Sequence, residues 1–144
     1  MVTCVDTSVL FSLYANDVHS SRLIAWLTSQ QRPLVVTSLN EFELSNALRF
    51  AEWRGAIQSG QAASSWAQFE EDRAAGRIVR YTCNLASVLD ESLRLSAAHT
   101  LVGGHRSFDI MHVAAALVIK AQDFLTFDDN QRRLAEAEGL TVPY

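Results

Sequence analysis

Short runs of apolar, largely β-branched residues alternate along the chain with longer stretches of helical periodicity. Runs of this kind are typical of buried strands. They predict five strands, at residues 2–5, 33–38, 77–83, 123–127 and 140–144. Strands that alternate with helices in this way predict an α/β fold, in which a parallel sheet of about five strands is flanked by helices on both faces.

The segments between these runs place apolar residues three and four positions apart, as the buried face of a helix does. The stripes are Leu44, Ala47, Leu48 and Ala51; Leu85, Val88, Leu89 and Leu93; and Ile110, Val113, Ala114 and Leu117. Trp66 and Phe69 mark a further helix with a polar opposite face. The aromatic surface around these two residues favours a homodimer, but the sequence does not locate the interface.

Composition limits the chain to one compact domain, residues 1–144. Of its 144 residues 49% are hydrophobic, which is enough for a core, and the net charge is -4. This charge argues against a broadly basic surface, so binding of RNA or DNA must depend on metal ions or on arginines such as Arg49, Arg54 and Arg106. Asp6 interrupts the apolar N-terminal run, which resembles neither a signal peptide nor a membrane span. We therefore expect a cytoplasmic protein that does not associate with a membrane.

Acidic residues directly follow the first and fourth predicted strands. Asp6 ends the run VTCVD, with Thr7 and Ser8 beside it, and Asp128 follows FLTF two positions after Thr126. Parallel sheets bind ligands at the carboxyl ends of their strands, most often where the strand order reverses. If the first and fourth strands are neighbours across such a reversal, the carboxylates of Asp6 and Asp128 converge.

Two further acids lie in the first turns of predicted helices. In TSLNEFELSNAL, Ser38 and Glu41 have the spacing of a capping box, which gives Glu41 a structural role and leaves Glu43 available for chemistry. Glu43 lies outside the apolar stripe and one turn from Asn46. Asp109 holds a similar position at the start of its own helix.

Each acid also has a purely structural explanation. Asp6 and Asp128 have the type and place of helix caps, Glu43 suits a solvated helix face, and Asp109 suits the positive end of a helix dipole. Four carboxylates gathered at one sheet edge, however, would repel one another unless cations neutralised them. Oxygen ligands without thiolates or paired histidines select a hard divalent ion, Mg²⁺ or Mn²⁺.

The segment VGGHRS and the helix after it add two basic side chains. Arg106 is a candidate phosphate contact, although an ordinary solvated loop explains it equally well. His112 lies among apolar neighbours, which is more typical of a packed, hydrogen-bonded histidine than of a ligand or a base. The chain contains neither a glycine-rich phosphate loop nor a G-x-S-x-G elbow, so phosphate-cradling loops and serine hydrolase chemistry lack support.

The segments VDTSVL, TSLNEFELSNAL, RSFDIMHVAAAL and LTFDDNQRRLAEAEGLTV, in this order, resemble a PIN domain, and specifically the VapC-type toxins of prokaryotic toxin–antitoxin modules. The resemblance covers residues 2–142. It implies that the four acids of the metal site are Asp6, Glu43, Asp109 and Asp128, with Thr7, Ser8, Asn46 and Thr126 as polar supports. The T-x-D spacing from Thr126 favours Asp128 over the adjacent Asp129.

The resemblance also implies a three-layer fold and an activity. Such toxins are metal-dependent endoribonucleases that form homodimers and are inhibited by a cognate antitoxin. We expect Asp6 and Asp109 to be the first ligands of Mg²⁺ or Mn²⁺, Glu43 to bind the metal or orient the attacking water, and Asp128 to complete the cage. The antitoxin is expected to lay a basic side chain over these carboxylates.

Two other functions are compatible with part of this pattern. A phosphatase of the haloacid dehalogenase type also has an Asp after its first strand, but it requires a second acid where Ser8 stands. A catalytically silent, receiver-like module that binds metal and a protein partner explains the acids at the strand ends, but not Glu43 on a helix. Cleavage of RNA, as opposed to a small phosphate monoester, distinguishes these functions.

Overall fold

The computed structural model describes residues 2–143 and contains a parallel sheet whose strands are each three or four residues long. Its four strands are β1 (Thr3–Val5), β2 (Leu34–Thr37), β3 (Ile78–Tyr81) and β4 (Asp123–Leu125). The strand order is β3-β2-β1-β4. The predicted neighbourhood of the first and fourth strands is therefore confirmed, with Cys4 opposite Phe124 in the register.

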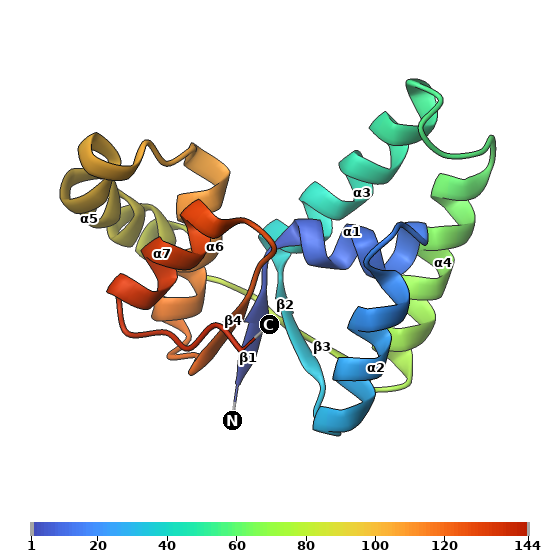
Figure 1. The fold of residues 1–144 in the computed structure, drawn as a ribbon, viewed down its shortest axis with the longest axis horizontal. Helices are drawn as coiled ribbons and strands as arrows, with labels where there is room; N and C mark the ends of the chain where they lie inside the picture. The colour runs from blue at the N-terminus through green and yellow to red at the C-terminus, as the bar shows by residue number, and fades with distance from the viewer. Residues whose placement is uncertain (1, 144) are drawn as a thin grey trace.

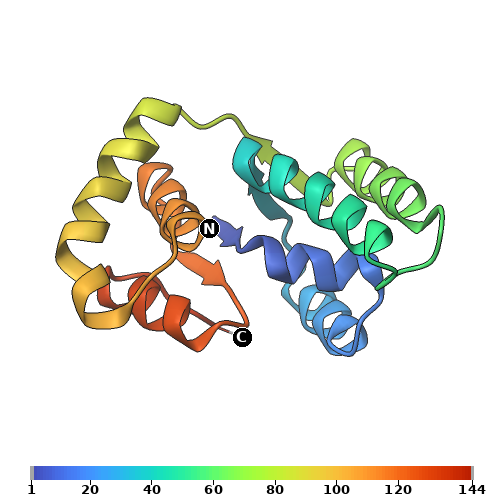
Figure 2. The same cartoon turned by 90° about the horizontal axis from the view of Figure 1, so that it is seen from above.

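Helices cover both faces of this sheet and give three layers (Figures 1 and 2). On one side lie α1 (Thr7–Ala15), α2 (Ser20–Gln30), α3 (Ser38–Trp53) and α4 (Gln61–Ala74). On the other side lie α5 (Leu85–Gly103), α6 (Ser107–Val118) and α7 (Asp129–Ala137). Within residues 2–143, no helix is long and apolar enough to cross a membrane.

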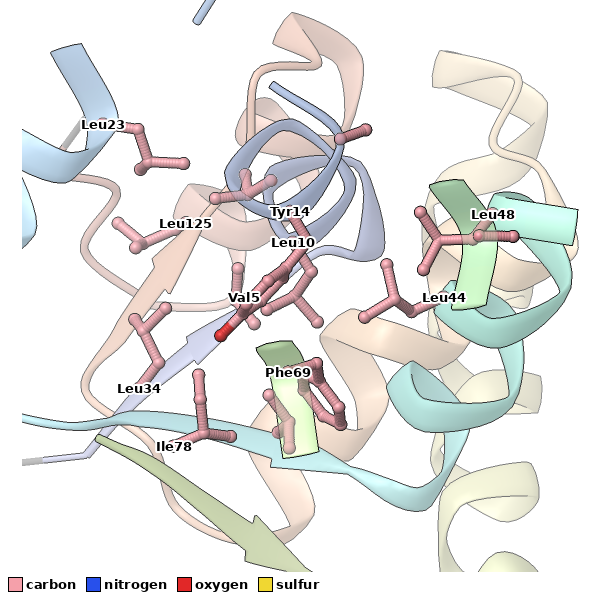
Figure 3. Close-up of a cluster of buried hydrophobic side chains, with 14 residues drawn as sticks. Val5, Leu10, Tyr14, Leu23, Leu34, Leu44, Leu48, Phe69, Ile78 and Leu125 are labelled. Carbon is pink, nitrogen blue, oxygen red and sulfur yellow. The ribbon is translucent and has the colours of Figure 1, made fainter. Parts of the chain in front are cut away.

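Alternating strand residues divide the core into two clusters, because successive side chains of a strand point to opposite faces. Val5 and Leu125 join Leu10 and Phe69 under α1–α4 (Figure 3). Cys4 and Phe124 face the other way and pack under α5–α7. Full burial of a side chain such as Leu10 contributes about 1.5–3 kcal/mol, so the two clusters fix both helix layers onto one sheet.

The predicted fifth strand, at residues 140–144, is wrong as a strand. Thr141 forms one isolated parallel bridge with Asp123, and its backbone hydrogen bonds reach only Gln122 and Phe124. Pro143 has no N–H to continue a ladder. The last residue of the predicted strand, Tyr144, lies outside the described residues.

The α5 stripe and the aromatic surface around Phe69 differ from the sequence prediction. Of the predicted α5 stripe, Val88 is buried, whereas Leu85, Leu89 and Leu93 are 53%, 46% and 71% exposed. This helix packs mainly against α6 and α7, so it buries a narrower face than the sequence suggests. Phe69 is fully buried and belongs to the core, so it adds no exposed aromatic surface.

The capping box of α3 begins one residue earlier than predicted. Thr37, not Ser38, is the N-cap; its hydroxyl accepts from the backbone N–H of Asn40, and the Asn40 side chain accepts from the backbone N–H of Thr37. Glu41 instead forms ion pairs with Arg73 and Arg80, at 2.9 and 3.0 Å. Its role is structural, as expected, but it joins α3 to α4 and β3.

Candidate active site

Asp6 stands where β1 passes into α1. Its backbone N–H donates to the carbonyl of Leu125 at 2.8 Å, which continues the pairing of β1 and β4 beyond the strand. One carboxylate oxygen, Oδ2, accepts from the backbone N–H and the hydroxyl of Ser8, so the side chain caps α1. The other oxygen, Oδ1, accepts from Gln131 at 3.1 Å. Asp6 is therefore both a cap and a buried, firmly oriented acid at the carboxyl edge of the sheet.

Glu43 reaches the same place from the second turn of α3. Its Oε1 lies 3.0 Å from Nε2 of His112, which belongs to α6 in the opposite helix layer. Burial alone raises the pKa of Glu43, but hydrogen bonds from His112 and Thr7 and the charge of Arg106 outweigh it and lower the pKa. Glu43 is thus held in its ionised form near neutral pH.

Asp6, Glu43 and His112 form a compact group of possible metal ligands. One atom of each lies within 4.8 Å of the other two. His112 is 3% exposed and is hydrogen-bonded on both ring nitrogens, as its apolar neighbours in the sequence indicate. The two carboxylates predicted at strand end and helix start therefore do converge.

Asp109 lies in the first turn of α6 and faces the same space. Burial raises its pKa, and the charges of Asp6 and Asp128 raise it further, while a hydrogen bond from Arg106 at 3.0 Å lowers it. The net shift is upward, which means that the ionised form is disfavoured in the absence of a further cation. Asp109 has its carboxylate paired with a guanidinium that is itself largely exposed.

The two carboxylate oxygens of Asp128 have different partners. Its Oδ1 caps α7 by accepting from the backbone N–H groups of Asn130 and Gln131, at 2.8 and 3.0 Å. Its Oδ2 lies 3.9 Å from Arg106, so this arginine stands between Asp109 and Asp128. The capping explanation therefore holds for Asp128, with one oxygen left toward the other acids.

These side chains lie around an open cleft of about 890 Å³. Asp6, Glu43 and Asp109 line it, together with Thr7 and Ser8, whereas Asp128 does not. The predicted support Asn46 is exposed and lies outside the lining, and Thr126 is fully buried below the cleft. A second cavity, of about 490 Å³ between α2 and α4, contains none of the predicted site residues.

The sequence matches the model of a known family. Residues 3–137 fit the family model of the PIN domain. The chain belongs to the PIN domain family. PIN domains are generally nucleases and typically use a divalent metal ion.

Solved structures share this fold at low sequence identity. VapBC2 from Rickettsia felis, bound to a DNA fragment from its promoter, has a chain that is 14% identical, with a TM-score of 0.69 over 99% of this chain and 97% of that one. PAE2754 from Pyrobaculum aerophilum is 19% identical, with a TM-score of 0.60 over 96% and 86%. FitAcB from Neisseria gonorrhoeae is 16% identical, with a TM-score of 0.59 over 98% and 96%. No curated protein matches the chain in sequence.

Two buried amides support the acids of this PIN domain and were not predicted from the sequence. Gln131 is 1% exposed; its Nε2 donates to Asp6 and to the backbone carbonyl of Asp109, and its Oε1 accepts from Thr126. Asn40 is 2% exposed and donates toward Thr7 and His112. The available signal was a polar residue within a buried stripe, since Asn40 stands one turn before Leu44.

Proposed function

We propose that this PIN domain is a Mg²⁺- or Mn²⁺-dependent endoribonuclease and the toxin of a type II, VapBC-like toxin–antitoxin system. The observation that carries the proposal is the convergence of Asp6 and Glu43 with Asp109 in one open cleft at the carboxyl edge of the sheet. The family match supports a nuclease, and the predicted haloacid dehalogenase and receiver-like alternatives have no comparable support.

The residues at this edge fit a hard divalent cation. Their donors are carboxylate oxygens, which Mg²⁺ and Mn²⁺ prefer. The pKa of Asp109 is raised chiefly by burial, which Arg106 opposes and to which Asp6 and Asp128 add less, so a further cation beside this carboxylate would favour its ionised form. We assign Asp6, Glu43 and Asp109 to the metal, with Oδ2 of Asp128, which lies 3.9 Å from Arg106, at the margin. A bound divalent ion supplies neutralisation of the phosphate and a lowered pKa for water.

The protein's own groups have separate tasks in this mechanism. Glu43, ionised and held by Thr7 and His112, presents a fixed carboxylate that would bind the metal or orient the attacking water. Ser8 and Gln131 keep both oxygens of Asp6 in fixed directions. Arg106, whose side chain is 80% exposed, turns from Asp109 to a phosphate oxygen of the substrate.

The walls of the cleft suit a single strand of RNA. Phe50 and Phe108 line it and are 54% and 40% exposed, which leaves ring faces for unstacked bases. Arg54 lines the same wall, with its guanidinium 5.9 Å from the centre of the Phe50 ring. Arg49, the third predicted arginine, lies outside the cleft and is hydrogen-bonded to Ser45. The basic track is therefore reduced to Arg54 and Arg106.

Cleavage of a structured RNA in Mn²⁺ and in EDTA tests the activity. We expect wild type to cut in Mn²⁺ alone, and Asp6→Asn or Asp109→Asn to fall to the level seen in EDTA, because each loses a charged metal ligand. The exposed Asp90 of α5 provides the matched control, and Asp90→Asn should cut like wild type. Full activity of either site variant would overturn the assignment, and hydrolysis of a small phosphate monoester instead of RNA would identify a phosphatase.

The toxin role is tested by co-expression with a small protein encoded beside the gene. The shared fold with VapBC2 and FitAcB chains supports such a partner. Expression of the chain alone should arrest growth, co-expression should restore it, and the two proteins should co-purify. The partner's basic side chain is expected over Asp6 and Asp109. Growth that is indifferent to both proteins would contradict a toxin.

A further inference from the structure

We propose that His112 is not a metal ligand but a positioning residue, which donates its Nε2–H to Glu43 and so keeps the ligand set entirely oxygen. The proposal rests on the metal-dependent function proposed above. Distance alone leaves the role of His112 open, because its ring nitrogen lies within 4.8 Å of a ligand atom from both Asp6 and Glu43. The hydrogen bonds around it decide between donor and ligand.

The first step is the orientation of the Asn40 amide. Its Oδ1 accepts from the backbone N–H of Thr37 at 3.0 Å, as part of the α3 capping box. Its Nδ2 faces the carbonyl of Val5 at 3.1 Å, which can only accept. Both contacts would be lost if the amide were turned over, so its N–H groups must point toward α1 and α6.

The second step is the tautomer of His112. Nδ1 of its ring lies 3.3 Å from Nδ2 of Asn40, which is a donor and has no lone pair to offer. Nδ1 must therefore accept, and the ring hydrogen resides on Nε2. Asn40 has two hydrogens for Val5, Thr7 and His112, so one hydrogen is shared between acceptors.

The third step is the consequence for Glu43. The Nε2–H of His112 points at Oε1 of Glu43 at 3.0 Å, with Thr7 Oγ1 at 3.2 Å. A nitrogen that carries hydrogen cannot bind a metal. Moving that hydrogen to Nδ1 would set two N–H groups against each other in a buried place and leave Glu43 without its donor. His112 therefore fixes the direction of Glu43, and an all-oxygen site favours Mg²⁺ or Mn²⁺ over Zn²⁺.

Nuclear magnetic resonance tests the tautomer on the metal-free protein. Long-range ¹H–¹⁵N correlation spectra distinguish a ring nitrogen that carries hydrogen from one that does not. We expect His112 to show hydrogen on Nε2 and a free Nδ1. The opposite tautomer would overturn the proposal, whatever the activity of the protein proves to be.

Mn²⁺ binding tests the positioning role, with His112→Gln and His112→Leu as the variants. Gln keeps an N–H at a reach similar to that of Nε2, whereas Leu removes every donor. We expect pulsed electron paramagnetic resonance of wild type with Mn²⁺ to show no directly bound nitrogen. The Kd for Mn²⁺ should rise roughly 10- to 100-fold in His112→Leu, as is typical when a group behind a ligand is lost, and should be largely restored in His112→Gln.

Other outcomes separate the failure of this proposal from that of the function. A directly bound nitrogen in wild type would overturn the positioning role and leave a metal nuclease intact. An unchanged Kd in a folded His112→Leu would make His112 purely structural. Absence of Mn²⁺ binding in wild type would overturn the metal-dependent function and this inference together. The nitrogen signal of wild type decides the question even if His112→Leu does not fold.

Discussion

The acids of the cleft depend on buried amides that touch no solvent. Gln131 links α7 to Asp6, to the backbone of Asp109 and to Thr126 through three hydrogen bonds. Burial of an amide costs free energy unless it is hydrogen-bonded. Its removal destabilises the fold further, because its buried partners are left without a donor or an acceptor. The spacing between the carboxylates is therefore set by a side chain that does not face the cleft.

Replacement of Gln131 by Leu should lower the free energy of unfolding by about 1–3 kcal/mol, since Thr126 and Asp6 each lose a buried partner. Urea unfolding of purified protein measures this difference. Gln68 on α4 is exposed, and Gln68→Leu should stay within about 0.5 kcal/mol of wild type. Equal stability of the two variants would show that the Gln131 hydrogen bonds contribute nothing.

The sequence predicted single acids better than it predicted their partners. Asp6 and Glu43 were found because carboxylates at a strand end and beside an apolar stripe are conspicuous. Asn40 and Gln131 were missed because each sits within a buried helical face, where one polar residue looks like a break in the pattern and not like a hydrogen-bonding group. Partner identity depends on tertiary contacts between residues up to 125 positions apart.

At the scale of secondary-structure elements, the first residues of the helices position much of the site. Asp6 caps α1, Thr37 caps α3 and Asp128 caps α7, and all three caps directly follow or lie near strand ends. The same short connections therefore terminate strands, begin helices and place side chains at the edge where ligands bind. Because one residue can serve both purposes, the capping role of Asp6 is compatible with its proposed role in the metal site.

Asp128 allows the cap to be separated from the charge. Asn is as good an N-cap as Asp, so Asp128→Asn should preserve stability, whereas Asp128→Ala should lose about 1 kcal/mol. Thermal or urea unfolding measures both variants. If cleavage of RNA falls equally in the two, the charge at the margin of the site is what matters; if Asp128→Asn is as unstable as Asp128→Ala, the capping role is wrong.

The contact between α5 and α7 should give the fold an acid-sensitive component. Arg94 hydrogen-bonds Glu138 and lowers its pKa below the ordinary 4.5, burial opposes this, and His99 adds to the lowering. Because the folded pKa is the lower one, this stabilisation is present above pH 4.5 and is lost as the pH falls through the folded pKa. The difference in unfolding free energy between wild type and Glu138→Gln should therefore be largest near neutral pH and shrink in acid. A pH-independent difference would contradict it.

At the scale of the whole molecule, the layer formed by α5–α7 exposes an apolar ridge. Leu85, Leu89 and Leu93 recur every four residues along α5 and are each at least 46% exposed. Side chains of this kind in one row favour burial against another protein surface. If the chain forms the expected homodimer, we expect this ridge to be the contact, since Phe69 is buried.

The dimer proposal predicts a change in mass when the ridge is charged. Leu89→Glu should sediment as a monomer in analytical ultracentrifugation, because the carboxylate would be buried without a partner. Ile24→Glu on α2, in the opposite layer and 47% exposed, provides the control and should remain a dimer. Monomeric wild type, or a dimer that survives Leu89→Glu, would refute the α5 interface.

The overall architecture was predictable because the alternation of strands and helices indicates a layered α/β fold, in which the first and fourth strands are neighbours where the strand order reverses. The tail was not predictable in the same way. Its apolar run LTVPY has strand composition, but its pairing is limited to one bridge at Thr141, and the proline that follows ends the ladder. Local composition cannot indicate how many partners a strand will find.

The pairing of β1 with β4 also affects when the site can form during synthesis of the chain. Asp6 and Glu43 leave the ribosome long before Asp109 and His112, and β4, which flanks β1, is among the last elements to be made. Domains fold as units during synthesis, so the nascent chain has no assembled carboxylate group until its final third has emerged. If the chain cuts RNA, it is therefore harmless to the ribosome and messenger that produce it until α6 and β4 have been made.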